Sequence, residues 1–156
     1  MNLPFEYDRV AVGEFGGTLP TPTDFTHARV VILPIPLDRT TSYVPGTRNG
    51  PHEILVASSH MELWDEETQT DVHSIGIYTM PEMEFPFASI DDVMHEIRRV
   101  AAELVSRGKF PFVLGGEHSI TRRSRASVSY HDNPPGSGVP TAGMIAGSRP
   151  SQSIVM

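Results

Sequence analysis

A short run of residues, Gly115-Gly116-Glu117-His118-Ser119, combines the residue types that could support chemistry. Paired glycines let the backbone turn sharply, so the histidine that follows them can face a cleft. A neutral imidazole is a good ligand for Mn, Fe, Ni or Zn, and Glu117 could orient a neighbouring ligand. A histidine after a glycine turn could equally serve as a capping or packing residue, and the run lacks the Walker and dinucleotide glycine spacings. The run therefore predicts one candidate metal ligand, His118, and leaves the structural interpretation open.

The composition limits the classes of protein to which the chain can belong. Its 156 residues suit one domain, with 38% hydrophobic and 20% charged residues, as in a globular protein. The absence of cysteine excludes disulfide scaffolds, thiolate zinc sites and cysteine nucleophiles. A net charge of -7 argues against binding to nucleic acid. The sequence has neither a long apolar run nor a secretory signal, so we expect a cytoplasmic protein without a membrane segment.

Charge and composition divide the chain into three parts. Residues 1–28 contain several glycines and prolines without a sustained period, which predicts an extended N-terminal arm. Residues 29–121 have the periodic patterns of a folded domain. Residues 122–156 contain seven Ser, four Gly and four Pro and only one of the 19 acidic residues, which predicts an irregular tail.

The middle part alternates strand and helix patterns. We predict a buried strand over 30–35, a helix opening at Gly50-Pro51, a strand over 74–79, a helix starting at Ser89 and a strand over 112–114. The apolar face of the first helix would comprise Ile54, Leu55, Met61, Leu63 and Trp64. Ser89 has an acid three residues later, as in a capping box, and Gly108 suits a C-terminal cap. This order indicates an α/β fold with a parallel sheet.

Two motifs resemble the ureohydrolase family, which includes arginase, agmatinase and formimidoylglutamase. The segment 112–121, which reads FVLGGEHSIT, looks like the first signature of that family. The segment 36–51, PLDRTTSYVPGTRNGP, is similar to the loop and helix start after the family's first strand. Its form is closest to the bacterial and archaeal agmatinases. Together with Glu62-Leu63-Trp64-Asp65, these motifs extend the resemblance over about 25–121.

The resemblance implies a fold, a cofactor and a reaction. The fold would be an arginase-like, three-layer α/β/α arrangement, incomplete in this chain, in a protein that forms a homo-oligomer. The cofactor would be a binuclear manganese site, with His118 matching the first metal-binding histidine. The reaction would be hydrolysis of agmatine to urea and putrescine, a step of polyamine biosynthesis. The loop over 42–51 would lie near the mouth of the site.

The chain also departs from the family pattern. The other metal ligands of the family lie in an Asp-Ala-His-x-Asp segment and in a later Asp-x-Asp segment, and neither is present here. We interpret Asp71-x-His73 and His131-Asp132 as solvated surface residues. One histidine cannot hold two manganese ions, so we expect this chain to be inactive, through a reading-frame error or a truncated gene copy. The alternatives are a noncatalytic chain that binds intact subunits, and arginine or guanidinobutyrate as the ancestral substrate.

Overall fold

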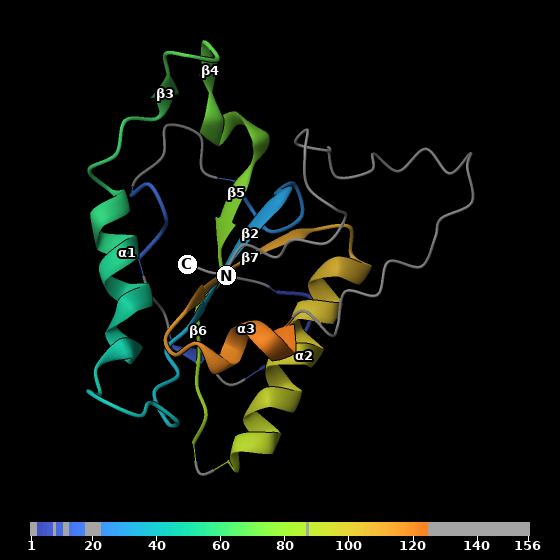
Figure 1. Ribbon diagram of the computed structural model, residues 1–156. Helices are drawn as coiled ribbons and strands as arrows, with labels where there is room; N and C mark the ends of the chain where they lie inside the picture. The colour runs from blue at the N-terminus through green and yellow to red at the C-terminus, as the bar shows by residue number, and fades with distance from the viewer. Residues whose placement is uncertain (1–2, 8, 11–12, 18–22, 87, 125–156) are drawn as a thin grey trace.

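A three-stranded parallel sheet lies at the centre of the computed structural model, which describes residues 3–7, 9–10, 13–17, 23–86 and 88–124 (Figure 1). The strands run in the order β5 (Ile77–Thr79), β2 (Val30–Ile35) and β7 (Phe110–Gly115). The predicted strand over 30–35 is confirmed. The strand predicted over 112–114 is longer, because β7 pairs with β2 along its whole length, from Val30 opposite Phe110 to Ile35 opposite Gly115.

Helices cover both faces of this sheet. Helix α1 (Gly50–Ser58) lies on one face, and α2 (Ile90–Ser106) with the short α3 (Ser119–Ser124) lies on the other (Figure 1). Alternate residues of β2 serve the two cores: Val31 and Leu33 belong to the cluster that includes α2, whereas Ile32 packs in a cluster with Leu55 of α1. The predicted three-layer α/β/α architecture is therefore confirmed.

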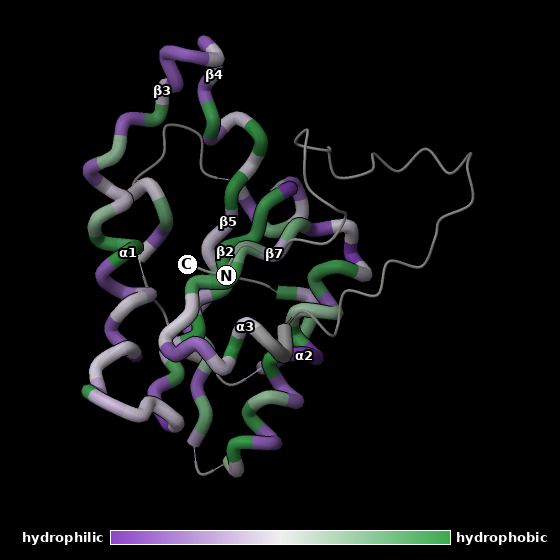
Figure 2. The backbone as a smooth tube through the Cα atoms, viewed as in Figure 1, coloured by the Kyte–Doolittle hydropathy of each residue, from purple (hydrophilic) through white to green (hydrophobic). Residues whose placement is uncertain are grey.

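Helix α2 forms as its sequence predicts. The Ser89 hydroxyl accepts a hydrogen bond from the Asp92 amide, and the Asp92 carboxylate accepts one from the Ser89 amide, which completes a capping box. Gly108 has φ +71° just beyond the helix, the left-handed conformation of a C-terminal cap. The apolar face is fully buried: Val93, Met94, Ile97, Val100, Ala101 and Leu104. Figure 2 shows the central strands as mainly hydrophobic and the β3–β4 hairpin as mainly hydrophilic.

The described part of the predicted N-terminal arm packs against its own domain. Leu3, Tyr7 and Phe25 are buried in the cluster that includes α2, and the Tyr7 hydroxyl donates to the Pro81 carbonyl at 2.7 Å. Strand β1 (Arg9–Val10) pairs antiparallel with β6 (Glu82–Met83). This segment is thus tied to the residues that follow β5.

The predicted apolar face of the first helix was wrong at its C-terminal end. Helix α1 stops at Ser58, where the hydroxyls of Ser58 and Ser59 donate to helix carbonyls at 2.6 and 2.7 Å. These bonds occupy acceptors of the last turn, and the chain then leaves the helix. Met61 and Trp64 lie outside the helix and are 58% and 54% exposed. Leu63, also predicted for this face, is half-buried beyond the helix end.

A small hairpin begins at Trp64, where the sequence predicted that the helix would continue. Trp64–Asp65 (β3) pairs antiparallel with Thr70–Asp71 (β4), and the 3-10 helix η2 (Val72–Ile75) follows. The strand predicted over 74–79 therefore begins only at Ile77, because Gly76 has φ +81° and interrupts the extended backbone.

The described residues include only the start of the predicted tail, since α3 continues to Ser124. His131-Asp132 and the rest of 125–156 lie outside the described residues. Within the described part of the chain, no helix is both long and apolar enough to cross a lipid bilayer.

Candidate functional site

The candidate site is built where β2 and β7 end side by side. The Gly116 amide donates to the Ile35 carbonyl at 2.9 Å, and the Glu117 amide donates to the Leu37 carbonyl at 2.9 Å. A Cβ atom on Gly116 would lie only 2.1 Å from the Leu37 carbonyl oxygen. Only glycine therefore lets the two backbones approach so closely, which explains the second glycine of the motif.

The segment 38–46, which we call the mouth loop, leaves the end of β2 and is tied to itself by Asp38. The Asp38 carboxylate accepts hydrogen bonds from the Gly46 amide at 2.6 Å and the Thr41 hydroxyl at 3.0 Å. The Arg48 guanidinium is farther away, at 3.4 Å. The Gly46 amide is the main cause that lowers the pKa of Asp38 below its ordinary value. The loop is thus stabilised with Asp38 ionised.

Glu117 joins the mouth loop to the turn after β7. Its Oε2 accepts the backbone amides of Arg39 and Thr40 at 2.7 and 2.6 Å, and its Oε1 accepts the hydroxyls of Thr40 and Ser119 at 2.5 Å each. The residue is only 4% exposed. Burial raises the pKa of the Glu117 carboxyl, but the hydrogen bonds outweigh burial and hold the pKa below its ordinary value. The sequence had suggested that Glu117 could orient a neighbour, and the structure shows which groups it holds.

His118 is exposed, and it lines an open cavity beside the mouth loop. The cavity has a volume of about 370 Å³. It is lined by Thr40, Thr41, Ser42, Tyr43, Val44, Thr47, Gly116, Glu117, His118 and Ser119. The two motifs of the sequence, 36–51 and 112–121, therefore meet around one cavity at the carboxyl ends of parallel strands, where ligands of open α/β sheets bind.

The described residues do not fit a binuclear manganese site by themselves. Within the described part of the chain, no group of three or more His, Cys, Asp or Glu side chains is placed to hold a metal ion. The carboxylate beside His118, that of Glu117, already has both oxygens engaged. Manganese prefers several oxygen ligands in a near-octahedral arrangement, so His118 alone is insufficient.

The interpretation of the Asp71–His73 pair as solvated surface residues fits Asp71, whose side chain is 44% exposed, and is wrong for His73. The His73 Nδ1 contacts the Asp71 carboxylate, and only 10% of the His73 side chain is exposed. The pair therefore ties η2 to the end of β4 and lies apart from the residues around His118.

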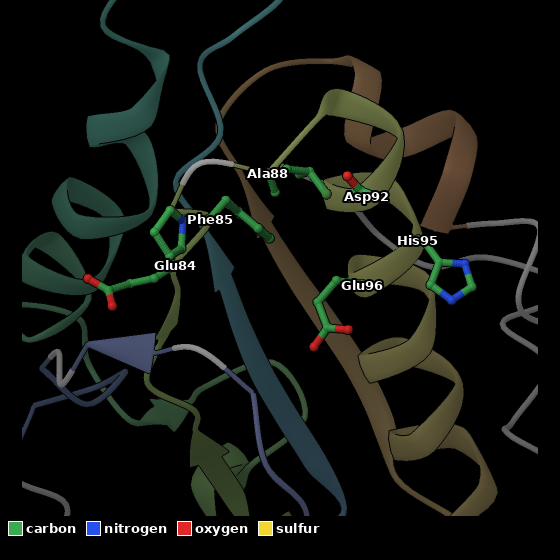
Figure 3. Close-up of a pocket in the computed structure, with 8 residues that line it drawn as sticks. Glu84, Phe85, Ala88, Asp92, His95 and Glu96 are labelled. Atoms are coloured by element: carbon green, nitrogen blue, oxygen red, sulfur yellow. The ribbon is translucent and has the colours of Figure 1, made fainter.

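A second cavity, of about 310 Å³, lies between the segment after β6 and the first turns of α2 (Figure 3). Figure 3 shows Phe85 directed toward α2 and Glu84 directed away from it. The Arg39 guanidinium joins the mouth loop to this segment, because it donates to the carbonyls of Phe85 and Ala88. No local pattern predicted this contact, since Arg39 and Ala88 are 49 residues apart.

Comparisons with known proteins agree with this geometry. Residues 28–137 match the arginase family. The N(1)-aminopropylagmatine ureohydrolase of Synechocystis is 39% identical over 104 residues, which cover 64% of this chain and 34% of that protein. The solved agmatine ureohydrolase of Thermoplasma volcanium is 30% identical with a TM-score of 0.63, over 67% of this chain and 36% of that one.

A more distant solved structure shares the fold alone. The formiminoglutamase of Trypanosoma cruzi, solved with Mn²⁺, has 18% identity and a TM-score of 0.59 over 67% of this chain and 37% of that one.

The chain belongs to the arginase family, because the family match covers residues 28–137. It spans 34% of the length of the Synechocystis protein.

Proposed function

We propose that this chain forms part of the active site of a manganese-dependent hydrolase that converts agmatine and water to putrescine and urea. In this reaction, the bond between the guanidinium carbon and the nitrogen of the aliphatic chain breaks. The oxygen of water becomes the urea oxygen, and both of its protons end on the departing nitrogen, so the guanidinium cation gives neutral urea and an ammonium group.

The observation that supports the proposal is the meeting of the two family motifs around one cavity. His118 and the mouth loop lie together there, although the sequence separates them by about 70 residues. The agmatine ureohydrolase of Thermoplasma volcanium and the Synechocystis ureohydrolase support a guanidino substrate. A substrate with agmatine's amine is favoured by the agmatinase-like form of the mouth loop, while arginine and guanidinobutyrate are the alternatives.

The residues of this chain would have distinct tasks at such a site. His118 offers an exposed imidazole nitrogen as one metal ligand. Ser42 lines the same cavity, where its hydroxyl could accept or donate a hydrogen bond to a polar substrate, whereas the Thr40 hydroxyl donates its proton to Glu117 and could only accept. The exposed Tyr43 and Val44 offer apolar surface at its rim. Because the described residues do not complete a manganese site, we expect the 156-residue chain alone to release no urea from agmatine.

A chimera tests the proposal directly. Residues 28–121 of this chain would replace the matching segment of the Thermoplasma volcanium agmatine ureohydrolase, which supplies the remainder of the fold. We expect manganese-dependent urea release from agmatine, lost in the chimera with His118→Ala. His60→Ala is the matched control, because His60 is exposed and lies beyond the end of α1, outside the cavity.

The outcome of the chimera experiment is decisive in two ways. A folded chimera that releases no urea from agmatine, arginine or guanidinobutyrate would contradict the hydrolase proposal. Full activity with His118→Ala would contradict the role of His118. For the chain alone, turnover on the order of 1 per second or faster would show that it supplies a complete site.

The second candidate function is a noncatalytic chain that binds intact subunits. It is favoured because the described residues contain no group of three or more His, Cys, Asp or Glu side chains that could hold a metal ion. Co-elution of this chain with a full-length relative on size exclusion would support it, and separate elution would contradict it. Cytoplasmic location, homo-oligomer formation and the boundaries at 28 and 121 stay predictions.

A further inference from the structure

The Glu117 carboxylate is fully engaged by groups from two distant segments. Each of its oxygens accepts two hydrogen bonds, at 2.5 to 2.7 Å, from Arg39, Thr40 and Ser119. An ionised carboxylate has about four acceptor positions, so these donors use its capacity. Glu117 therefore has no free lone pair for a metal ion or a substrate, even though it is next to His118.

The donors show that the Glu117 carboxylate acts mainly across the fold, because its one donor from α3 is the Ser119 hydroxyl. The two backbone amides that it binds belong to Arg39 and Thr40, which are 78 and 77 residues earlier. A residue that only capped α3 would accept amides from the first turn of that helix. The carboxylate, which lies in the turn after β7, instead binds amides of the mouth loop, which follows β2.

The connection continues to a third segment. The Arg39 side chain, whose backbone amide binds Glu117, donates to the carbonyls of Phe85 and Ala88 just before α2. The start of the mouth loop is thus held both by Glu117 and by the segment before α2. Asp38, the first residue of the loop, also accepts a hydrogen bond from the amide of Gly46, the last residue of the loop.

We propose that Glu117 is a positioning residue that locks the mouth loop onto the turn carrying His118, so that the cavity keeps its shape before any ligand binds. The consequence for hydrolysis rests on the proposed function, whereas the lock itself does not. Glu117 would act through the loop backbone and would not touch the substrate.

Amide hydrogen exchange on the 156-residue chain tests the lock. In Glu117→Gln, the side chain keeps only one acceptor oxygen and loses the charge that strengthens its hydrogen bonds, so the amides of Arg39 and Thr40 should exchange at least about tenfold faster. Amides of buried residues in α2 should keep their rates. Glu103→Gln is the matched control, because Glu103 makes an ion pair with Arg107 on α2, away from the loop. It should leave both loop amides unchanged.

A conservative pair keeps the test valid if Glu117→Gln does not fold. Thr40→Ser retains the hydroxyl that donates to Glu117, whereas Thr40→Val removes it at similar volume. We expect Thr40→Ser to preserve the protection of the Arg39 amide and Thr40→Val to reduce it. Equal protection in both variants, or unchanged loop exchange in a folded Glu117→Gln, would overturn the proposal.

The chimera separates this proposal from the proposed function. If the chimera hydrolyses agmatine, Glu117→Gln should lower kcat at least about tenfold while His60→Ala does not. If the chimera is inactive, the proposed function fails, and the exchange measurements still decide whether Glu117 locks the loop.

Discussion

Gly116→Ala should be among the most damaging single-methyl changes in the described fold. The added Cβ would lie 2.1 Å from the Leu37 carbonyl oxygen and 2.9 Å from the Leu37 nitrogen. Both are backbone atoms between β2 and the mouth loop, so no flexible side chain can move aside. Gly116 is not among the residues with positive φ, and the penalty is therefore steric and not conformational.

The magnitude follows from the contacts that must be given up. Overpacking of this kind costs about 1 to 3 kcal/mol. Moving the two backbones apart also weakens the bonds from Gly116 to Ile35 and from Glu117 to Leu37, at about 1 kcal/mol each. We expect a loss of about 4 kcal/mol, against a total unfolding free energy of about 5 to 15 kcal/mol for a typical domain.

Urea denaturation followed by far-UV circular dichroism measures this loss. With a slope of about 2 kcal/mol per molar urea, the midpoint should fall by about 2 M. Gly13→Ala is the matched control, because a Cβ there meets nothing within 4 Å. A Gly116→Ala midpoint within about 0.5 M of the wild-type value would refute the close approach of Leu37 to Gly116.

Two further changes test the cap of α2 and the mouth loop. Ser89→Ala should lower the unfolding free energy by about 1 kcal/mol in urea, because the Asp92 amide loses its acceptor, whereas Ser89→Thr should cost at most a few tenths; equal losses would contradict the cap. The pKa of Asp38 is lowered in the folded state. The hydrogen bonds of the ionised Asp38 carboxylate therefore stabilise the folded state above the unfolded pKa of about 3.9, and this stabilisation is lost as the pH falls through the folded pKa. The Gly46 amide should lose exchange protection as the pH falls through the lowered folded pKa of Asp38 in the wild type but not in Asp38→Asn, and the same pH dependence of Gly46 protection in both proteins would refute this role.

Local sequence patterns determined the parallel core and the place of the candidate ligand. The strand over 30–35 and the cap of α2 depend on residues within a few positions of each other, so both can be predicted from the sequence. The glycine turn after β7 placed His118 at the carboxyl end of a strand by the same reasoning. The hydroxyls of Ser58 and Ser59 ended α1 early, which is a local signal that the apolar spacing had hidden.

Only the tertiary structure decided how the site is held together. The bonds of Glu117 with Arg39 and Thr40 join groups 77 and 78 residues apart, and no local period encodes such a pairing. They form because β2 and β7 are adjacent and in register, which brings the two strand ends to one edge. The need for glycine at position 116 has the same origin, because a side chain there would clash with the backbone of Leu37, just after β2.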